Sequence, residues 1–118
     1  MARYAGLRET NATVAYVMRA VVDQAKLARA VEKARRALAP DVVRIRFDLG
    51  NDWTGDPSIF FKIVLSDEAS DESKLREITN NIERRILTGT NPDELGLNWY
   101  FNFRSLSEQN EMQDEAWK

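Results

Sequence analysis

The sequence contains no cysteine and no histidine. The absence of cysteine excludes disulfide bonds, thiolate nucleophiles and sulfur-ligated zinc or iron clusters, because each of these needs the cysteine sulfur. The absence of histidine removes the commonest general base and the commonest metal ligand of proteins. Few classes of enzyme are compatible with both absences. We therefore expect a protein that catalyses no reaction and needs no cofactor.

Long apolar runs are also missing. No stretch of about 18 apolar residues is available to span a bilayer, and residues 1–6 lack the apolar stretch of a secretory signal. A cytoplasmic protein that does not enter a membrane is the expectation. With 118 residues, of which 43% are hydrophobic, the chain is long enough for one domain with one core.

Positive and negative charges are unevenly distributed along the chain. Residues 1–46 contain ten Lys and Arg against four Asp and Glu, whereas residues 47–118 contain seven against fifteen. The net charge of −2 therefore combines a basic first part with an acidic second part. This pattern is typical of a helix with basic residues on its water-facing side. It would also orient an acidic partner, or a second copy of the chain in a homodimer.

Hydrophobic periodicity predicts two helices and three strands. A stripe of small apolar residues predicts a helix over residues 13–38, after a flexible start at residues 1–12. A second stripe predicts a helix that has Ser70 as its N-cap and ends near Gly89. Strict alternation predicts the strands, with Val43 on the core side of the first; their ranges are residues 42–49, 58–65 and 97–104.

These elements predict an α+β domain, a two-layer sandwich in the order α-β-β-α-β. Its three-stranded sheet, antiparallel or mixed, would carry both helices on one face and leave the other face wet. Residues 42–104 would hold the sheet and the second helix of a single domain that covers residues 1–118. The acidic segment at residues 105–118 opens with a capping pair, Ser105 and Glu108, and is expected to form a short helix or an ordered tail.

The loop between the first two predicted strands is longer than a usual hairpin connection and carries Trp53 at its centre. Tryptophan is over-represented at binding hot spots, although it also serves as an anchor packed across the end of a sheet. We expect a protein partner to contact this loop, the aromatic third strand and the segment that follows it. The predicted contact residues are Asp52, Trp53, Asp56, Tyr100, Arg104, Glu108 and Gln109.

RNA binding is a second hypothesis. Basic and aromatic residues share the predicted open face of the sheet, where cations would meet phosphates and rings would stack on unpaired bases. The residues of this face are Arg44, Arg46, Phe60, Lys62, Tyr100 and Arg104. The layout resembles that of ribosome-binding factors and type II KH domains, but the Gly-x-x-Gly clamp for a nucleotide backbone is absent. A solvated basic face is the structural alternative.

Magnesium-dependent hydrolysis of a nucleic acid is a third hypothesis. Asp48, Asp52 and Asp56 lie at a strand end and in the following loop, and carboxylates are ligands that Mg²⁺ prefers. Asp67 or Glu68 would have to complete the site, yet both follow the second strand and belong to the opposite end of the hairpin. Turn formation, helix capping and solubility account for these acids more simply.

Two sequence patterns resemble those of a group of small uncharacterised bacterial proteins. They are DWTGDPSIFF at residues 52–61 and YFNFRSLSEQ at residues 100–109. The resemblance covers residues 40–118, and genes of that group often neighbour genes for HEPN-domain proteins. It implies an antitoxin-like or regulatory member of a bacterial gene pair, whose partner is a helical protein of the HEPN type.

Overall fold

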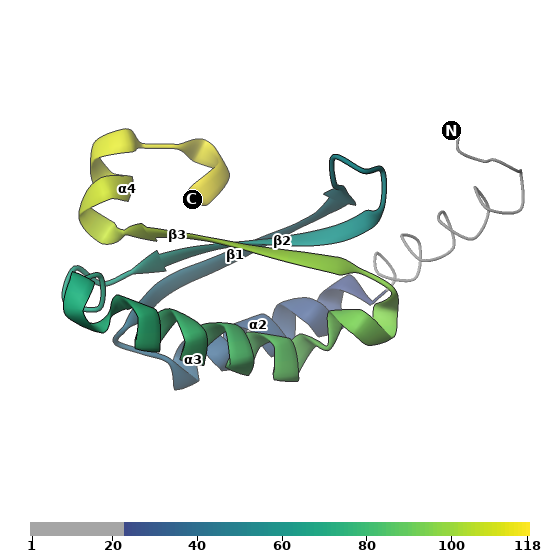
Figure 1. Cartoon of the computed structure of the whole chain (residues 1–118), viewed down its shortest axis with the longest axis horizontal. Helices are drawn as coiled ribbons and strands as arrows, with labels where there is room; N and C mark the ends of the chain where they lie inside the picture. The colour runs from purple at the N-terminus through teal and green to yellow at the C-terminus, as the bar shows by residue number, and fades with distance from the viewer. Residues whose placement is uncertain (1–22) are drawn as a thin grey trace, which may run out of the picture.

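A computed structural model describes residues 23–118 of the chain (Figure 1). The strands are β1 (Val42–Asn51), β2 (Pro57–Leu65) and β3 (Asn98–Ser105). Two helices, α2 (Gln24–Ala37) and α3 (Glu72–Thr90), cover one face of the sheet. A short helix, α4 (Leu106–Met112), and two 3-10 turns, η1 (Pro92–Leu95) and η2 (Glu115–Trp117), complete the described part. The predicted α+β class and the predicted order of helices and strands are confirmed.

Helix α2 corresponds to the second part of the helix predicted over residues 13–38. The first part, residues 13–22, and the flexible start expected at residues 1–12 lie outside the described residues. Leu27, Val31 and Ala34 are buried, because their spacing of three and four residues places them on one face of the helix. None of the helices within residues 23–118 has the length and apolar character that crossing a bilayer requires.

The central strand of the sheet is β2, which pairs antiparallel with β1 and parallel with β3. A short loop suffices for the antiparallel pair, whereas the parallel pair needs a crossover, which α3 and η1 provide. Ile59, Phe61 and Ile63 of β2 are 0% exposed, since the central strand is covered by both helices. The sheet is therefore mixed, and its core is centred on β2.

The first strand departs from the predicted alternation at one position. The register pairs Arg44 with Val64 and Val42 with Leu65, so Val43 is an extra residue in a β-bulge. Val42 consequently faces the core, where it is 1% exposed, and Val43 is only half-buried. The predicted core position of Val43 is wrong, because one inserted residue exchanges the two faces of the strand beyond it.

The N-cap of helix α3 is one residue later than predicted. The carboxylate of Asp71, not the hydroxyl of Ser70, accepts a hydrogen bond from the backbone N–H of Ser73 at 3.0 Å. The helix continues one residue past Gly89, and Asn91 then adopts the left-handed conformation with φ 47°. Asparagine is one of the few residues with a side chain that tolerates this region, so it ends the helix without glycine.

The face of the sheet opposite the helices is only partly open. Residues 106–118, here called the C-terminal segment, lie over the carboxyl ends of β2 and β3 on this face (Figure 1). Val64 of β2 and Trp117 of η2 are consequently buried, at 1% and 6% exposure. The expectation of a fully wet face is wrong for this half, because further chain covers it.

The start of the C-terminal segment is fixed by hydrogen bonds at the N-terminus of α4. The predicted capping pair is confirmed: Ser105 Oγ accepts from the backbone N–H of Glu108 at 3.1 Å, and Glu108 Oε1 accepts from that of Ser105 at 2.9 Å. Asp67, at the exit of β2, accepts from the N–H and the hydroxyl of Ser107 at 3.0 and 2.6 Å. These bonds set the direction in which the segment leaves β3.

Candidate functional site

The loop between β1 and β2 rises from the sheet at the end away from the C-terminal segment (Figure 1). The carboxylate of Asp52 fixes its conformation. Oδ1 accepts hydrogen bonds from the N–H of Thr54 (2.9 Å), the hydroxyl of Thr54 (2.6 Å) and the N–H of Asp56 (3.1 Å). Oδ2 accepts from the Tyr100 hydroxyl (2.7 Å) and the Asn98 amide (3.2 Å), both on β3. One side chain thus ties the loop to itself and to β3.

These hydrogen bonds shift the pKa of the Asp52 carboxyl group and the pKa of the Tyr100 hydroxyl group in opposite directions. They lower the pKa of Asp52 well below its ordinary range, the bond from the Thr54 hydroxyl contributing most. They raise the pKa of Tyr100, because its hydroxyl donates to a carboxylate whose negative charge disfavours the phenolate. Asp52 is only 9% exposed. The structure therefore gives Asp52 an internal bonding role, and its predicted contact with a partner stays a prediction.

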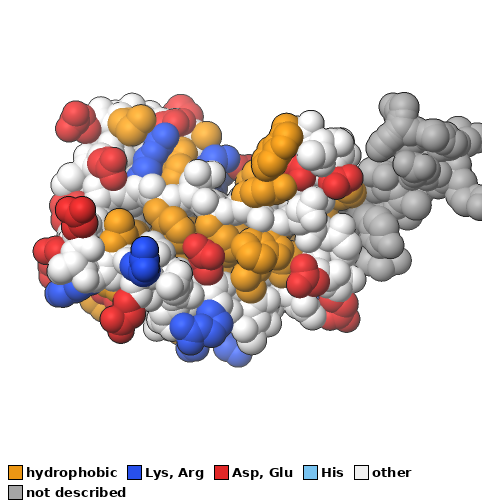
Figure 2. Space-filling view, in the orientation of Figure 1, with side chains coloured by type: hydrophobic (Ala, Val, Ile, Leu, Met, Phe, Trp, Pro, Cys, Tyr) orange, Lys and Arg blue, Asp and Glu red, His pale blue; other side chains and the backbone are white. Residues whose placement is uncertain are grey.

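Trp53 projects from this rigid loop, and its side chain is 80% exposed. Its ring lies 5.2 Å from that of Tyr100, tilted by 53°, and Tyr100 stacks on Phe60 at 5.4 Å and 19°. The three residues form a continuous surface, here called the aromatic ridge (Phe60, Tyr100 and Trp53). Figure 2 shows hydrophobic side chains standing up at the position of the raised loop.

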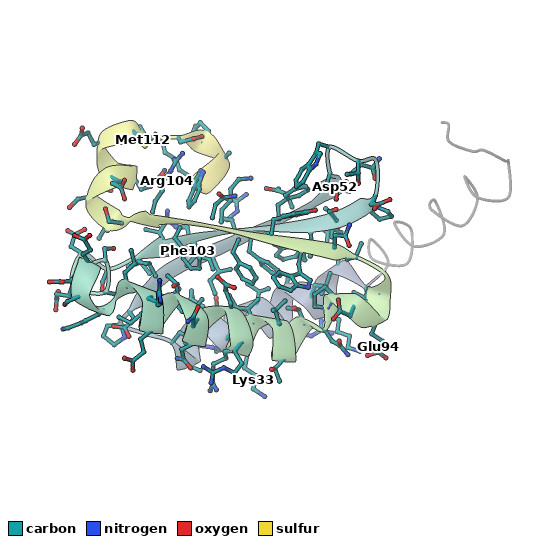
Figure 3. All side chains as sticks on the ribbon, viewed as in Figure 1. Lys33, Asp52, Glu94, Phe103, Arg104 and Met112 are labelled. Carbon is teal, nitrogen blue, oxygen red and sulfur yellow. The ribbon has the colours of Figure 1, made fainter. Side chains whose placement is uncertain are left out.

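The structure divides the predicted contact residues into two groups. Asp52, Trp53, Asp56 and Tyr100 meet at the raised loop, where the exposed Asp56 also accepts a hydrogen bond from the N–H of Asp52 at 2.9 Å. Arg104, Glu108 and Gln109 belong to the other end of the same face; Figure 3 shows Arg104 and Asp52 well separated along the sheet. A single small contact patch therefore does not include all seven.

Arg104 and Gln109 hold the C-terminal segment in place. The guanidinium of Arg104 lies 4.2 Å from the centre of the Trp117 ring, and it donates to Gln109 Oε1 at 3.1 Å and to Asp114 Oδ2 at 3.3 Å. Arg44 donates to the backbone carbonyl of Trp117 at 3.1 Å. The sequence did not predict a role for Trp117, because its partner Arg44 is 73 residues away.

The basic residues of the predicted nucleic-acid surface are mostly engaged. Arg44 and Arg104 contact the C-terminal segment, and Lys62 forms an ion pair with Asp48 at 2.8 Å. Arg46 is exposed, while Phe60 and Tyr100 belong to the aromatic ridge. The structure thus leaves fewer cations for phosphates on this face than the sequence suggested, and their contact with RNA stays a prediction.

The acidic residues weighed as magnesium ligands have separate roles. Asp48 pairs with Lys62, Asp52 fixes the raised loop, and Asp67 caps α4. Asp56 and Glu68 are exposed. Within residues 23–118, no group of three or more such side chains is placed to hold a metal ion.

The aromatic ridge is a projection and not a pocket. Two hollows of about 470 and 610 Å³ lie instead beside helices α2 and α3, and residues such as Ala30 and Arg84 line them. Comparison of this chain with protein-family models, with curated proteins and with solved structures gave no match. A projecting surface of this kind suits a recess on another macromolecule better than it suits a small substrate.

Proposed function

We propose that this protein is a non-catalytic interaction module that binds a partner protein through the aromatic ridge. The observation that carries the proposal is the state of Trp53, which is 80% exposed although the loop that bears it is fixed by the hydrogen bonds of Asp52. A rigid, exposed indole loses little conformational entropy on binding. The free energy gained when a partner buries it is therefore only slightly offset by an ordering cost.

The surroundings of the ridge supply a polar rim. Asp48 pairs directly with Phe60 in the sheet register, so the ion pair of Asp48 and Lys62 lies beside the ridge on the same face. Asp56 adds an exposed carboxylate on the loop itself. Apolar anchors at the centre of an interface give affinity, whereas charges at the rim fix the orientation of the partner. The partner should therefore offer an apolar recess with polar edges.

The biological form of the proposal is regulation by occlusion. A partner whose recess accepts Trp53 has the surface of that recess covered in the complex. Covering the partner's surface in this way suits an antitoxin-like or regulatory member of a bacterial gene pair. The resemblance of residues 52–61 and 100–109 to proteins of such pairs supports a helical HEPN-type protein as the partner.

The test compares two tryptophan variants of the full chain. Trp53→Ala is expected to weaken binding of the co-expressed HEPN-type partner about 30- to 1000-fold, the loss typical of a hot spot, as measured by titration calorimetry. Trp99→Ala is the matched control, because Trp99 lies on the other face of the sheet, in β3. Equal affinity of wild type and Trp53→Ala for the partner would refute the role of the ridge.

RNA binding is the second candidate, and the stacked rings of the ridge are the observation that favours it, since unpaired bases stack on such surfaces. The engagement of Arg44, Arg104 and Lys62 within the chain argues against it. A salt titration with single-stranded RNA distinguishes the two. Phosphate binding weakens steeply and linearly in a log–log plot, whereas an apolar protein interface changes little.

A further inference from the structure

The two edges of the sheet differ in how they are protected from other strands. The β1 edge has a bulge at Val43 and carries the charged side chains of Arg44, Arg46 and Asp48, features that discourage pairing with another strand. The β3 edge has a regular register, no proline and one charged residue, Arg104, which Asp114 pairs at 3.3 Å. Within residues 23–118, no strand pairs with the outer side of β3.

An aromatic row follows this unprotected edge on the helix side of the sheet. Trp99 is 38% exposed, and Phe101 and Phe103 are half-buried. The rings are ordered by mutual contact, since Phe101 lies 5.9 Å from Trp99, 6.2 Å from Phe103 and 4.8 Å from Phe61 of the core. Figure 2 shows hydrophobic side chains exposed along the line between β3 and α3, and Figure 3 places Phe103 there. Two helices therefore leave the outer side of the third strand uncovered.

We propose that a second copy of this chain pairs with the β3 edge, antiparallel and about a two-fold axis at Phe101, to form a six-stranded sheet. In this register Trp99 lies opposite Phe103 of the second copy, and Tyr100 lies opposite its Asn102. The helices of both copies fall on the same side of the joined sheet. The two aromatic rows then continue one another, and the unpaired backbone groups of both edges are satisfied.

The second copy is the occupant because β3 is complementary to itself. Reversed about Phe101, the strand keeps its alternation, with Trp99, Phe101 and Phe103 on one face and Asn98, Tyr100, Asn102 and Arg104 on the other. Arg104 falls opposite Asn98, so no like charges meet, and its charge is already balanced by Asp114. An edge with a regular register, no proline and a single balanced charge is a template that strand pairing can use. The raised loop is the connection between β1 and β2 and is not part of the β3 edge, so this dimer does not depend on the function proposed for the ridge.

Analytical ultracentrifugation of the full chain tests the proposal. We expect the wild type to have the mass of two chains. For Trp99→Lys we expect the dimer dissociation constant to rise about 100-fold, because the interface loses one tryptophan from each chain and gains two positive charges. Trp53→Lys is the matched control: it makes the same exchange at a more exposed indole on the other face and should leave the mass unchanged. Thermal melts followed by circular dichroism establish that both variants fold.

Cross-linking tests the register, because the natural chain has no cysteine. Mixing the single variants Trp99→Cys and Phe103→Cys under mild oxidation should give a disulfide between the two different chains. Neither variant should form one alone, since residues 99 and 103 of one strand are not opposite themselves. A wild-type chain that stays monomeric at every protein concentration in the ultracentrifuge would overturn the proposal. The β3 edge would then be available for pairing with a strand of another protein. A Trp99→Cys homodimer would overturn the two-fold axis at Phe101.

Discussion

Asp52 and Trp53 are neighbours in sequence with opposite positions in the structure. Asp52 is 9% exposed and bonds to β3, whereas Trp53 is 80% exposed. The length of the loop and its tryptophan were enough to select this region from the sequence. The role of Asp52 was not predictable, because its partners Asn98 and Tyr100 lie 46 and 48 residues away and become neighbours only when β3 joins the sheet.

The acid dependence of stability should reflect Asp52. Its pKa is lower in the folded chain than in the unfolded chain, where a carboxyl group has a pKa of about 3.9. The folded state therefore binds fewer protons, and the stability that Asp52 contributes is complete above that pH and is lost as the pH falls through the folded pKa. We expect Asp52→Asn to lower the free energy of unfolding at neutral pH and to flatten its decrease in acid.

Urea denaturation of wild type and Asp52→Asn, at a series of pH values from neutral to acid, measures this effect. Asp56→Asn is the control, because the backbone N–H and carbonyl of Asp56, and not its carboxylate, take part in the loop. If the free energy of unfolding decreased equally steeply with falling pH in wild type and in Asp52→Asn, the carboxylate would not stabilise the folded loop.

At the scale of whole elements, local sequence patterns predicted the strands and helices. The departures from these predictions arise from tertiary contacts. Alternation located all the strands but could not reveal the bulge at Val43, which only the pairing of β1 with β2 defines. The capping pair of Ser105 and Glu108 is a local signal and was found. The path of the C-terminal segment depends on the contact between Arg104 and Trp117, which no local pattern encodes.

The C-terminal segment should be attached mainly through Trp117. This side chain is 6% exposed, and the guanidinium of Arg104 lies 4.2 Å from the centre of its ring. We expect Trp117→Ala to lower the free energy of unfolding by about 3 kcal/mol, since a buried aromatic residue is lost. Met112→Ala in the same segment is the control, because Met112 is 56% exposed and should change the stability by less than about 0.5 kcal/mol.

Urea denaturation provides both values, and limited proteolysis after Ser105 provides an independent readout of the segment. Faster cleavage in Trp117→Ala than in Met112→Ala is the expected result. Equal cleavage rates would mean that the bonds at the start of α4, and not Trp117, hold the segment on the sheet.

At the scale of the whole molecule, the sheet is covered unequally on its two faces. Helices α2 and α3 cover one face, and the C-terminal segment covers half of the other (Figure 1). Within residues 23–118, the aromatic ridge on the open face and the aromatic row at the β3 edge stay uncovered. They lie on different faces of the sheet, so each can be altered by substitution without changing the side chains of the other.

Neighbouring phenylalanines of β2 should separate stability from binding. Phe61 is 0% exposed in the core, so Phe61→Ala is expected to cost about 3–5 kcal/mol of stability. Phe60 is half-buried on the opposite face, and Phe60→Ala should cost less than about 2 kcal/mol while it weakens partner binding through the ridge. Chemical denaturation and calorimetry measure the two effects. A larger loss of stability for Phe60→Ala than for Phe61→Ala would contradict the assignment of these side chains to the two faces of the sheet.

The graded exposure of the three tryptophans has a practical consequence. Trp53 stands on the raised loop, Trp99 lies on the β3 edge and Trp117 lies within the C-terminal segment, with exposures of 80%, 38% and 6%. Indole emission shifts and is quenched according to contact with water. Variants that keep a single tryptophan therefore carry an intrinsic fluorophore at one chosen surface, and iodide should quench them in that same order.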